Sequence, residues 1–211
     1  EAGVALKESA TATFSGSDTS IPAVKSVEAK GNKAFKVVFT EPIKTDLKIK
    51  GNYAINGNEP AADGTVSADN TSVEFEADLP LGENSVEVIA KNTLTDYAGN
   101  KVLGGTFKFT VSAPTAVTQA VSATFINQNT VQVTFDNLVK LNEGTDYSAN
   151  FYWNTNGADG YKQYVADSSN TVTKVDDKTF KVNFTGTSNF IQPGKIYFFV
   201  EGLTDYYANS V

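Results

Sequence analysis

The sequence contains no cysteine, histidine, methionine or arginine, and all 17 of its basic residues are lysine. Without histidine or cysteine, the chain has no imidazole general base, no thiolate nucleophile and no zinc or haem site of the usual kinds. It also has no disulfide framework. These absences leave carboxylates, lysines, tyrosines and hydroxyl groups for chemistry, and we do not expect an enzyme.

Positive charge and long apolar runs are scarce as well. The formal net charge is −7 at pH 7 over 211 residues. Proteins that bind nucleic acid use basic patches against phosphates and bidentate arginine contacts to guanine, so an acidic, arginine-free surface argues against that partner. No apolar run approaches the roughly 18 residues of a membrane-spanning helix, and nothing resembles a signal peptide. We expect neither nucleic acid nor membrane insertion.

The chain does contain an internal repeat. The segment AFKVVFTEPIK (34–44) aligns with TVQVTFDNLVK (130–140), 96 positions later. The nonapeptide LTDYAGNKV (94–102) returns as LTDYYANSV (203–211), 109 positions later. The difference between the two offsets means that the second copy carries about 13 extra residues between its halves.

The start of the chain resembles the end of the first copy. EAGVALKESATATFSGSDTSIPAV (1–24) lines up with YAGNKVLGGTFKFTVSAPTAV (97–117). We therefore take the sequence as a piece of something longer. The predicted divisions are the last strand of a preceding unit plus a linker in residues 1–18, one unit in residues 19–113, and a second unit in residues 114–211.

The pattern of the chain is typical of β-strands throughout. Apolar and polar residues alternate with period 2 in seven segments rich in valine, phenylalanine, threonine and tyrosine, and clusters of asparagine, glycine and aspartate separate them. These segments are 34–39, 72–77, 85–90, 106–111, 130–135, 179–184 and 195–200. Units of this length with about seven short strands predict an all-β protein made of tandem immunoglobulin-like antiparallel β-sandwiches with Greek-key connections.

Three motifs carry a resemblance to a known family. A strand ending in VVFTEPI (37–43), the segment LPLGENSVEV (79–88) and DYAGN (96–100) resemble the bacterial immunoglobulin-like modules of Gram-positive surface-layer (S-layer) proteins. The resemblance extends over residues 19–211. It implies a structural module, located at the bacterial cell surface, of a protein that assembles into a two-dimensional lattice on the cell wall.

The same resemblance implies partners and leaves an alternative open. The partners would be other copies of the protein and neighbouring immunoglobulin-like domains of the same chain, and such lattices often depend on calcium bound near domain junctions. Similar modules occur in adhesins and in accessory regions of secreted glycosidases. An adhesin or carbohydrate-binding module is therefore the alternative. The second copy departs from the motif, since it reads DYYANSV (205–211).

The repeated Asp-Tyr turn has a structural and a metal-binding interpretation. In the structural one, Asp96 accepts backbone hydrogen bonds, and Gly99 or Asn100 takes a positive φ at low cost. In the second copy Ala208 replaces Gly99. Asn209 stands at the position of Asn100, and because asparagine tolerates positive φ, we expect the turn to survive.

In the metal-binding interpretation, calcium would collect six to eight oxygen ligands from carboxylates, amides and carbonyls. No loop has the EF-hand spacing. Glu41 and Asp136 follow the aligned phenylalanines of the two copies, and we expect them to be equivalent. The predicted calcium ligands near the junctions are Asp18, Asp96, Asn100, Asp136 and Asp205, with Glu41 close to them.

The extra residues of the second copy form an aromatic-rich insertion, residues 146–170. It holds the only tryptophan of the chain among asparagines and aspartates. Such rings stack on sugars, anchor protein interfaces or pack locally under a hairpin, and the sequence leaves all three open. The candidate binding or interface residues are Tyr147, Tyr152, Trp153, Tyr161 and Tyr164.

Overall fold

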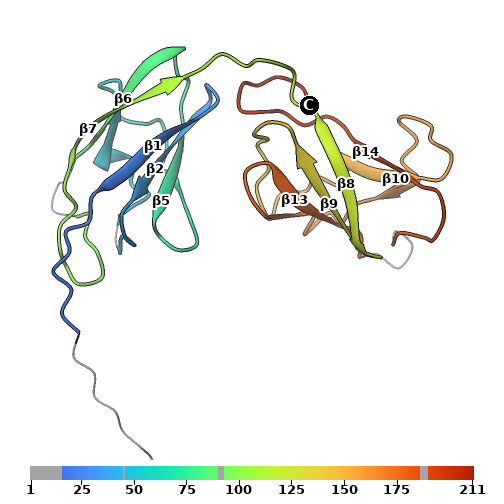
Figure 1. Ribbon diagram of the computed structural model, residues 1–211, viewed down its shortest axis with the longest axis horizontal. Coiled ribbons are helices and arrows are strands. Elements are labelled where there is room, and N and C mark those ends of the chain that lie inside the picture. Colours follow the sequence, from blue (N-terminus) through green and yellow to red (C-terminus); the bar gives the residue numbers. More distant parts are fainter. Residues whose placement is uncertain (1–15, 45, 90–92, 186–189) are drawn as a thin grey trace, which may run out of the picture.

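The computed structural model describes residues 16–44, 46–89, 93–185 and 190–211. They form two β-sandwiches joined by a single connection (Figure 1). The described residues contain no α-helix and one short 3-10 helix, Lys50–Asn52, and none of their helices is long and apolar enough to cross a membrane. The strand predicted in residues 1–17 lies almost wholly outside the described residues.

The first sandwich has the strand order of a constant-type immunoglobulin domain. Its first sheet has the order β1-β2-β5-β4 and its second sheet the order β3-β6-β7. Lettered in chain order, these are the ABED and CFG sheets of that fold. The strands are β1 (Val24–Lys30), β2 (Ala34–Phe39), β3 (Tyr53–Ile55), β4 (Thr65–Val66), β5 (Ser72–Glu76), β6 (Gly82–Val88) and β7 (Gly105–Val111).

The second sandwich repeats the first sheet and changes the other. Its sheets have the orders β12-β13-β9-β8 and β11-β10-β14. Strand β11 is added beside β10, and β14, the counterpart of β6, has no described strand on its other side. The strands are β8 (Ala120–Asn127), β9 (Thr130–Phe135), β10 (Phe151–Asn154), β11 (Tyr164–Val165), β12 (Val172–Lys174), β13 (Thr179–Asn183) and β14 (Tyr197–Val200).

Each sandwich has its own hydrophobic core, built from the alternating strands. In the first unit Phe35, Val37 and Phe39 of β2 point inward, and the ring of Phe35 stacks on that of Phe75 with centroids 5.5 Å apart. In the second unit Val131 and its alternating neighbours on β9 do the same. The all-β sandwich class is confirmed. The exact limits of the units, 19–113 and 114–211, stay predictions.

All seven segments predicted from alternation are strands: β2, β5, β6, β7, β9, β13 and β14. Two of the other described strands, β8 and β10, show why alternation misses them. Every residue of β8 is exposed, and every residue of β10 is buried. Alternation with period 2 requires one solvent-exposed and one buried face, so neither strand shows it.

Candidate functional site

The repeated nonapeptide folds into the same corner in both units. In the first, the backbone N–H of Asn100 donates to Oδ1 of Asp96 at 2.8 Å, and Nδ2 of Asn100 donates to Oδ2 at 2.8 Å. In the second, the N–H of Asn209 donates to Oδ1 of Asp205 at 2.9 Å. Both aspartates are buried. The structural role expected of this turn is therefore realised in both copies.

The positive φ of the corner falls on one position in both copies. Gly99 has φ of 94° and Ala208 has φ of 62°. The expectation that Asn209 would relieve the loss of glycine is therefore wrong. The hydrogen bonds to Asp205 fix the backbone so that position 208 must be left-handed, and an alanine there costs about 1 to 2 kcal/mol.

Hydrogen bonding keeps Asp96 charged although it is buried. Burial raises the pKa of Asp96, but hydrogen bonds from the side chain and backbone of Asn100 and from the backbone of Gly99 and Ala98 outweigh it, so the pKa lies below its ordinary value. A carboxylate held in its charged form at neutral pH is the species that a cation would meet.

The first corner carries a cluster of three carboxylates. Oxygen atoms of Asp18, Glu41 and Asp96 lie within 4.8 Å of one another, with Asp18 exposed, Glu41 half-buried and Asp96 buried. The hydroxyl of Ser20 donates to Oδ1 of Asp18 and lies 3.4 Å from Oε2 of Glu41. The structure therefore brings together the linker carboxylate and the turn carboxylate that the sequence grouped.

Asn100 has a different role from the one expected of a ligand. Its Nδ2 donates to Oδ2 of Asp96 and, at 3.2 Å, to the backbone carbonyl of Asp18. It thus offers hydrogens to the cluster where a metal ligand would offer a lone pair. In this arrangement Asn100 holds the two aspartates in place.

The second corner has no such cluster in the described part of the chain. Asp136 occupies the position of Thr40, because Gln119 N–H donates to Asp136 Oδ1 at 2.8 Å just as Ala23 N–H donates to Thr40 Oγ1 at 3.1 Å. The expected equivalence of Glu41 and Asp136 is therefore wrong by one residue. The counterpart of Glu41 is Asn137, and that of Asp18 is Pro114.

In the second corner a threonine hydroxyl contacts the buried aspartate, where the first corner has two further carboxylates. Thr118 Oγ1 donates to Oδ2 of Asp205 at 2.9 Å, and both residues are buried. Thr118 replaces Pro22 of the first unit, which has no side-chain donor. Asp136 and Asp205, which the sequence placed among the metal ligands, each accept hydrogen bonds from nearby donors. Among the described residues, neither belongs to a group of three carboxylates.

The second corner also forms the junction between the two units. The backbone N–H of Asn32, in the turn between β1 and β2, donates to the carbonyl of Tyr206 at 3.1 Å. A Cβ on Gly31 would lie 2.3 Å from that same oxygen, so only glycine fits. Tyr206 Oη donates to Glu74 Oε1 at 2.8 Å. The units are therefore held by direct contacts in addition to their linker.

An ion pair lies behind these contacts. The ammonium group of Lys30, whose residue is 3% exposed, pairs with Asp177, which also pairs with Lys174 at 2.6 Å. Burial raises the pKa of Asp177, but hydrogen bonds from the two lysines and their charges outweigh it and hold the pKa at about 2. Burial and the nearby Glu74 raise the pKa of Tyr206.

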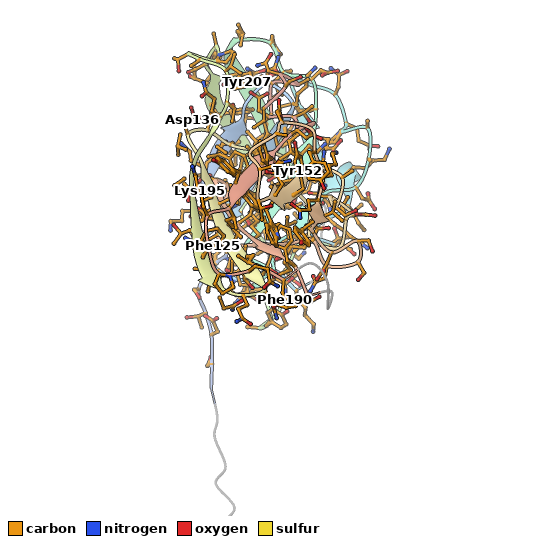
Figure 2. The ribbon with its side chains drawn as sticks, turned by 90° about the vertical axis from the view of Figure 1, so that its right-hand side faces the viewer. Phe125, Asp136, Tyr152, Phe190, Lys195 and Tyr207 are labelled. Carbon is orange, nitrogen blue, oxygen red and sulfur yellow. The ribbon has the colours of Figure 1, made fainter. Side chains whose placement is uncertain are left out.

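The aromatic insertion turns its largest rings inward. Tyr152 and Trp153 are 0% exposed. Trp153 stacks on Tyr164 with centroids 4.0 Å apart, and Tyr152 stacks on Phe199 at 4.9 Å. Figure 2 shows Tyr152 amid the side chains of the second unit. An exposed binding surface built on Tyr152 and Trp153 is therefore wrong, and local packing describes these rings.

The remaining aromatic candidates do not form a shared surface with them. Tyr147 is half-buried and its Oη accepts a hydrogen bond from the N–H of Asn142 at 3.1 Å. Tyr161 is 49% exposed. A tryptophan buried on the third strand of a sandwich is a hallmark of immunoglobulin domains, and β10 is the third strand of this unit. That signal was available in the sequence.

Two curated proteins match most of the chain. The Surface-layer 125 kDa protein of Lysinibacillus sphaericus is 28% identical over 206 residues, covering 94% of this chain and 16% of that protein. The Outer cell wall protein of Brevibacillus brevis is 31% identical over 194 residues, covering 89% of this chain and 17% of that protein. The chain thus spans about a sixth of the length of these relatives.

No protein-family model matches the chain. Among solved structures, domains 1–6 of the surface layer protein SbsC align with a TM-score of 0.46 and 18% identity, over 92% of this chain and 34% of that one. The sequence relatives confirm both the resemblance to S-layer proteins that the three motifs indicated and the expected location at the bacterial cell surface.

Proposed function

We propose that this chain is a structural, non-enzymatic module of a self-assembling S-layer protein. Its partners are neighbouring immunoglobulin-like domains and other copies of the same protein in a two-dimensional lattice. The observation that carries the proposal is the match to a surface-layer protein over 206 residues, or 94% of the chain. The lack of histidine and cysteine supports a role without catalysis.

The contacts between the two units support a structural role in a lattice. A lattice subunit has to hold the angle between its domains, because a small rotation at one junction displaces every contact beyond it. Here Gly31, Tyr206 and the Lys30–Asp177 pair fix that angle by direct contact. Contacts between subunits are then individually weak and many, and multivalency supplies the cohesion.

Electron microscopy tests this proposal. The protein that carries these residues should form ordered sheets or tubes, and Gly31→Val should disorder them by loosening the junction. Gly57→Val is the matched control, because Gly57 also has a positive φ, of 84°, but has no atom within 4 Å of an added Cβ. Monomers that persist under all conditions would contradict the proposal.

Calcium binding at the first corner is part of the proposal. Asp18, Glu41 and Asp96 supply carboxylate oxygens within 4.8 Å of one another, the hard ligands that calcium prefers. Three carboxylates so close repel one another, and a divalent cation removes that cost. Water would complete the coordination on the exposed side. Calcium there would fix residues 16–23 against the sandwich.

The two corners provide their own control for this test. Calorimetry with increasing calcium should raise the melting temperature of the first unit and leave that of the second unchanged, since a ligand of the folded state stabilises it. Glu41→Gln should abolish the shift. Thr40→Asp, which imitates the second corner at the equivalent of Asp136, should leave a shift. A flat response to millimolar calcium would remove the metal from the proposal.

Nothing in the described residues favours the carbohydrate-binding alternative. Its main support was an exposed aromatic surface around Trp153, whose ring is buried against Tyr164. A glycan array remains the direct test of that alternative. If a glycan binds, the variant Tyr161→Ala removes the exposed ring of the insertion. Unchanged glycan binding by this variant would mean that this ring does not contribute to the glycan site.

A further inference from the structure

A cleft separates the two units beside their junction. In Figure 1 the units lie side by side, with the connection from β7 to β8 at the top. The cleft has a volume of about 570 Å³, and residues of both units line it. Lys36 on β2 and Glu74 on β5 belong to the first unit, and Asn142, between β9 and β10, belongs to the second. The units therefore touch at one place and stand apart next to it.

Three contacts between the units each place a carboxylate of one unit against a donor of the other. These charged contacts are Lys140 to Glu76, Tyr206 to Glu74, and Lys30 to Asp177. All three carboxylates line the cleft. The charges that join the two units therefore lie on the cleft side of the junction.

Two further contacts between the units carry no charge. The backbone N–H of Asn32 donates to the carbonyl of Tyr206 at 3.1 Å, and Tyr207 Oη donates to the carbonyl of Ser112 at 2.8 Å. Ser112 directly follows β7, so the second of these neutral contacts lies at the connection itself. Salt screens interactions between charges, and it therefore leaves the neutral contacts in place.

No apolar core spans the junction in the part of the chain that the structure describes. Each of the two hydrophobic clusters contains residues of one unit only. Residues 112–117 of the connection are all exposed. Domains of one chain move relative to each other unless a large hydrophobic interface holds them. The angle between these two units therefore depends on the charged and the neutral contacts.

The pair of Lys30 and Asp177 is the charged contact whose loss has the largest consequence. Lys30 is 3% exposed, and Asp177 is its only ion-pair partner among the described residues. An ammonium group that is buried without a counter-charge is strongly disfavoured, because nothing replaces the water that it has lost. Since Asp177 belongs to the second unit, opening the cleft lets water reach the ammonium group.

We propose that the junction is a hinge, which the charged contacts hold closed and for which the neutral contacts form the pivot. When the charged contacts are screened or lose a charge, the second unit rotates about the neutral contacts and the cleft opens. The angle between the units thus responds to the ionic environment. The hinge is a property of the chain in solution and needs neither calcium nor a lattice, so it and the proposed function fail separately.

Salt acts unequally on the charged contacts. The side chains of Lys140 and Glu76 are 33% and 73% exposed, whereas that of Lys30 is 4% exposed. The screening length in water falls from about 8 Å at physiological ionic strength to about 3 Å at 1 M, and buried pairs are screened much less than exposed ones. Salt should therefore open the cleft in part, and full opening requires the loss of the charge on Asp177.

The distance across the cleft tests the hinge. The chain has no cysteine, so Ala68→Cys and Asn142→Cys place two spin labels at exposed positions on opposite sides of the cleft. Pulsed electron paramagnetic resonance should show a longer mean distance at high than at low sodium chloride concentration. Labels at Ala68 and Thr110, both in the first unit, should show no change. A distance across the cleft that high salt leaves unchanged would overturn the hinge.

Two pairs of variants identify the contacts that keep the cleft closed. Asp177→Asn should lengthen the distance more than salt does. Asp176→Asn is its matched control, because it removes the same charge one residue away, from an exposed side chain that accepts a hydrogen bond from the backbone N–H of Lys178 in its own unit. Glu76→Gln should reduce the salt response, whereas Glu59→Gln, which removes an exposed ion pair within the first unit, should not.

A second substitution distinguishes the hinge from local damage. In the double variant of Lys30→Met with Asp177→Asn no buried charge remains, so the cleft should close again, whereas independent losses of stability would add. Thermal unfolding followed by the fluorescence of Trp153 shows whether the second unit is folded in each variant. An unchanged distance across the cleft in folded Asp177→Asn, or a double variant as open as the single one, would overturn the proposal.

Discussion

The corner at Asp96 and the corner at Asp205 share a backbone conformation and differ in the residues that surround it. Both aspartates accept a hydrogen bond from the backbone N–H of an asparagine four residues on, at 2.8 and 2.9 Å, whereas the bond from the asparagine side chain is 2.8 Å long in the first corner and 3.4 Å in the second. Around Asp96 lie two more carboxylates and an exposed Tyr97. Around Asp205 lie the hydroxyl of Thr118 and a Tyr206 buried against the other unit.

The difference shows how a duplicated turn acquires separate tasks. The hydrogen bonds inside the turn use atoms within five residues, so they survive sequence change elsewhere. The surroundings depend on the linker and on the end of the first core strand, and three replacements there convert an acidic cluster into a neutral cap: Asp18 to Pro114, Pro22 to Thr118, and Glu41 to Asn137.

Removing the carboxylate of the second corner should have the largest effect. Asp205→Ala leaves the N–H groups of Tyr207 and Asn209 and the hydroxyl of Thr118 without their acceptor. Because these donors are at or near the buried junction, we expect the second unit to lose about 3 kcal/mol of unfolding free energy. Fluorescence of Trp153, the only tryptophan, reports the unfolding of this unit in urea titrations.

Asp136→Ala is the control for this variant. Because Asp136 is exposed, its loss should lower the unfolding free energy by less than about 1 kcal/mol. Equal losses for Asp205→Ala and Asp136→Ala would contradict the structural role assigned to Asp205.

A side chain at Gly31 should break the contact between corner and neighbour. Gly31→Ala places a Cβ 2.3 Å from the carbonyl of Tyr206, so the turn has to withdraw. We expect a loss of about 2 kcal/mol in the coupling of the two units, as for overpacking in a core. Energy transfer between dyes on the two units, or small-angle scattering, measures it. Gly57→Ala also places an alanine at a positive φ, but no atom lies within 4 Å of its Cβ, so this variant should leave the junction intact.

Acid should weaken the same junction. The folded-state pKa of Asp177 is about 2, below its ordinary value of 3.8. The ion pairs of Asp177 therefore stabilise the folded state fully above about pH 5, and this contribution is lost as the pH falls through 2. Because the side chain is partly exposed, solvent screening limits the contribution to about 1 kcal/mol. The distance between dyes on the two units should increase over that range. Asp177→Asn should flatten the response. Asp69 also has a pKa of about 2, but it lies in an exposed loop of the first unit and should not affect this distance.

Exchanging the left-handed residue between the corners should have the smallest effect. Ala208→Gly should stabilise the second unit by about 1 kcal/mol, since φ of 62° is strained for alanine. Gly99→Ala, at φ of 94°, should destabilise the first unit by about as much. Urea titrations of the two variants give both signs. The same sign for both would mean that the two corners differ in backbone as well as in surroundings.

Part of the candidate site could be read from the sequence and part could not. The grouping of Asp18 with Asp96 followed from the repeat, because the linker and the turn flank the same end of a sandwich. The alignment of 34–44 with 130–140 already pairs Thr40 with Asp136 and Glu41 with Asn137, so the expected equivalence of Glu41 and Asp136 is a one-residue misreading of the repeat. The matching hydrogen bonds at Thr40 and Asp136 agree with that alignment. No sequence pattern near Gly31 indicates that this residue contacts the other unit.

The local sequence pattern also does not predict that the aromatic rings of the insertion are buried. Trp153 and Tyr152 are neighbours on one strand, and alternation would place one of them in solvent. Both are covered, because Tyr164 stacks on one face of the strand and Phe199 on the other. These partners lie 11 and 47 positions away in the sequence.

The sequence by itself determined the all-β class, the duplication, the shared turn and the likeness to S-layer proteins. Alternation, turn residues and repeats are relations between residues a few positions apart, so composition and spacing contain them. The tertiary structure alone decided which carboxylates meet and which tyrosine is exposed. Those features depend on distances between segments that only packing brings together.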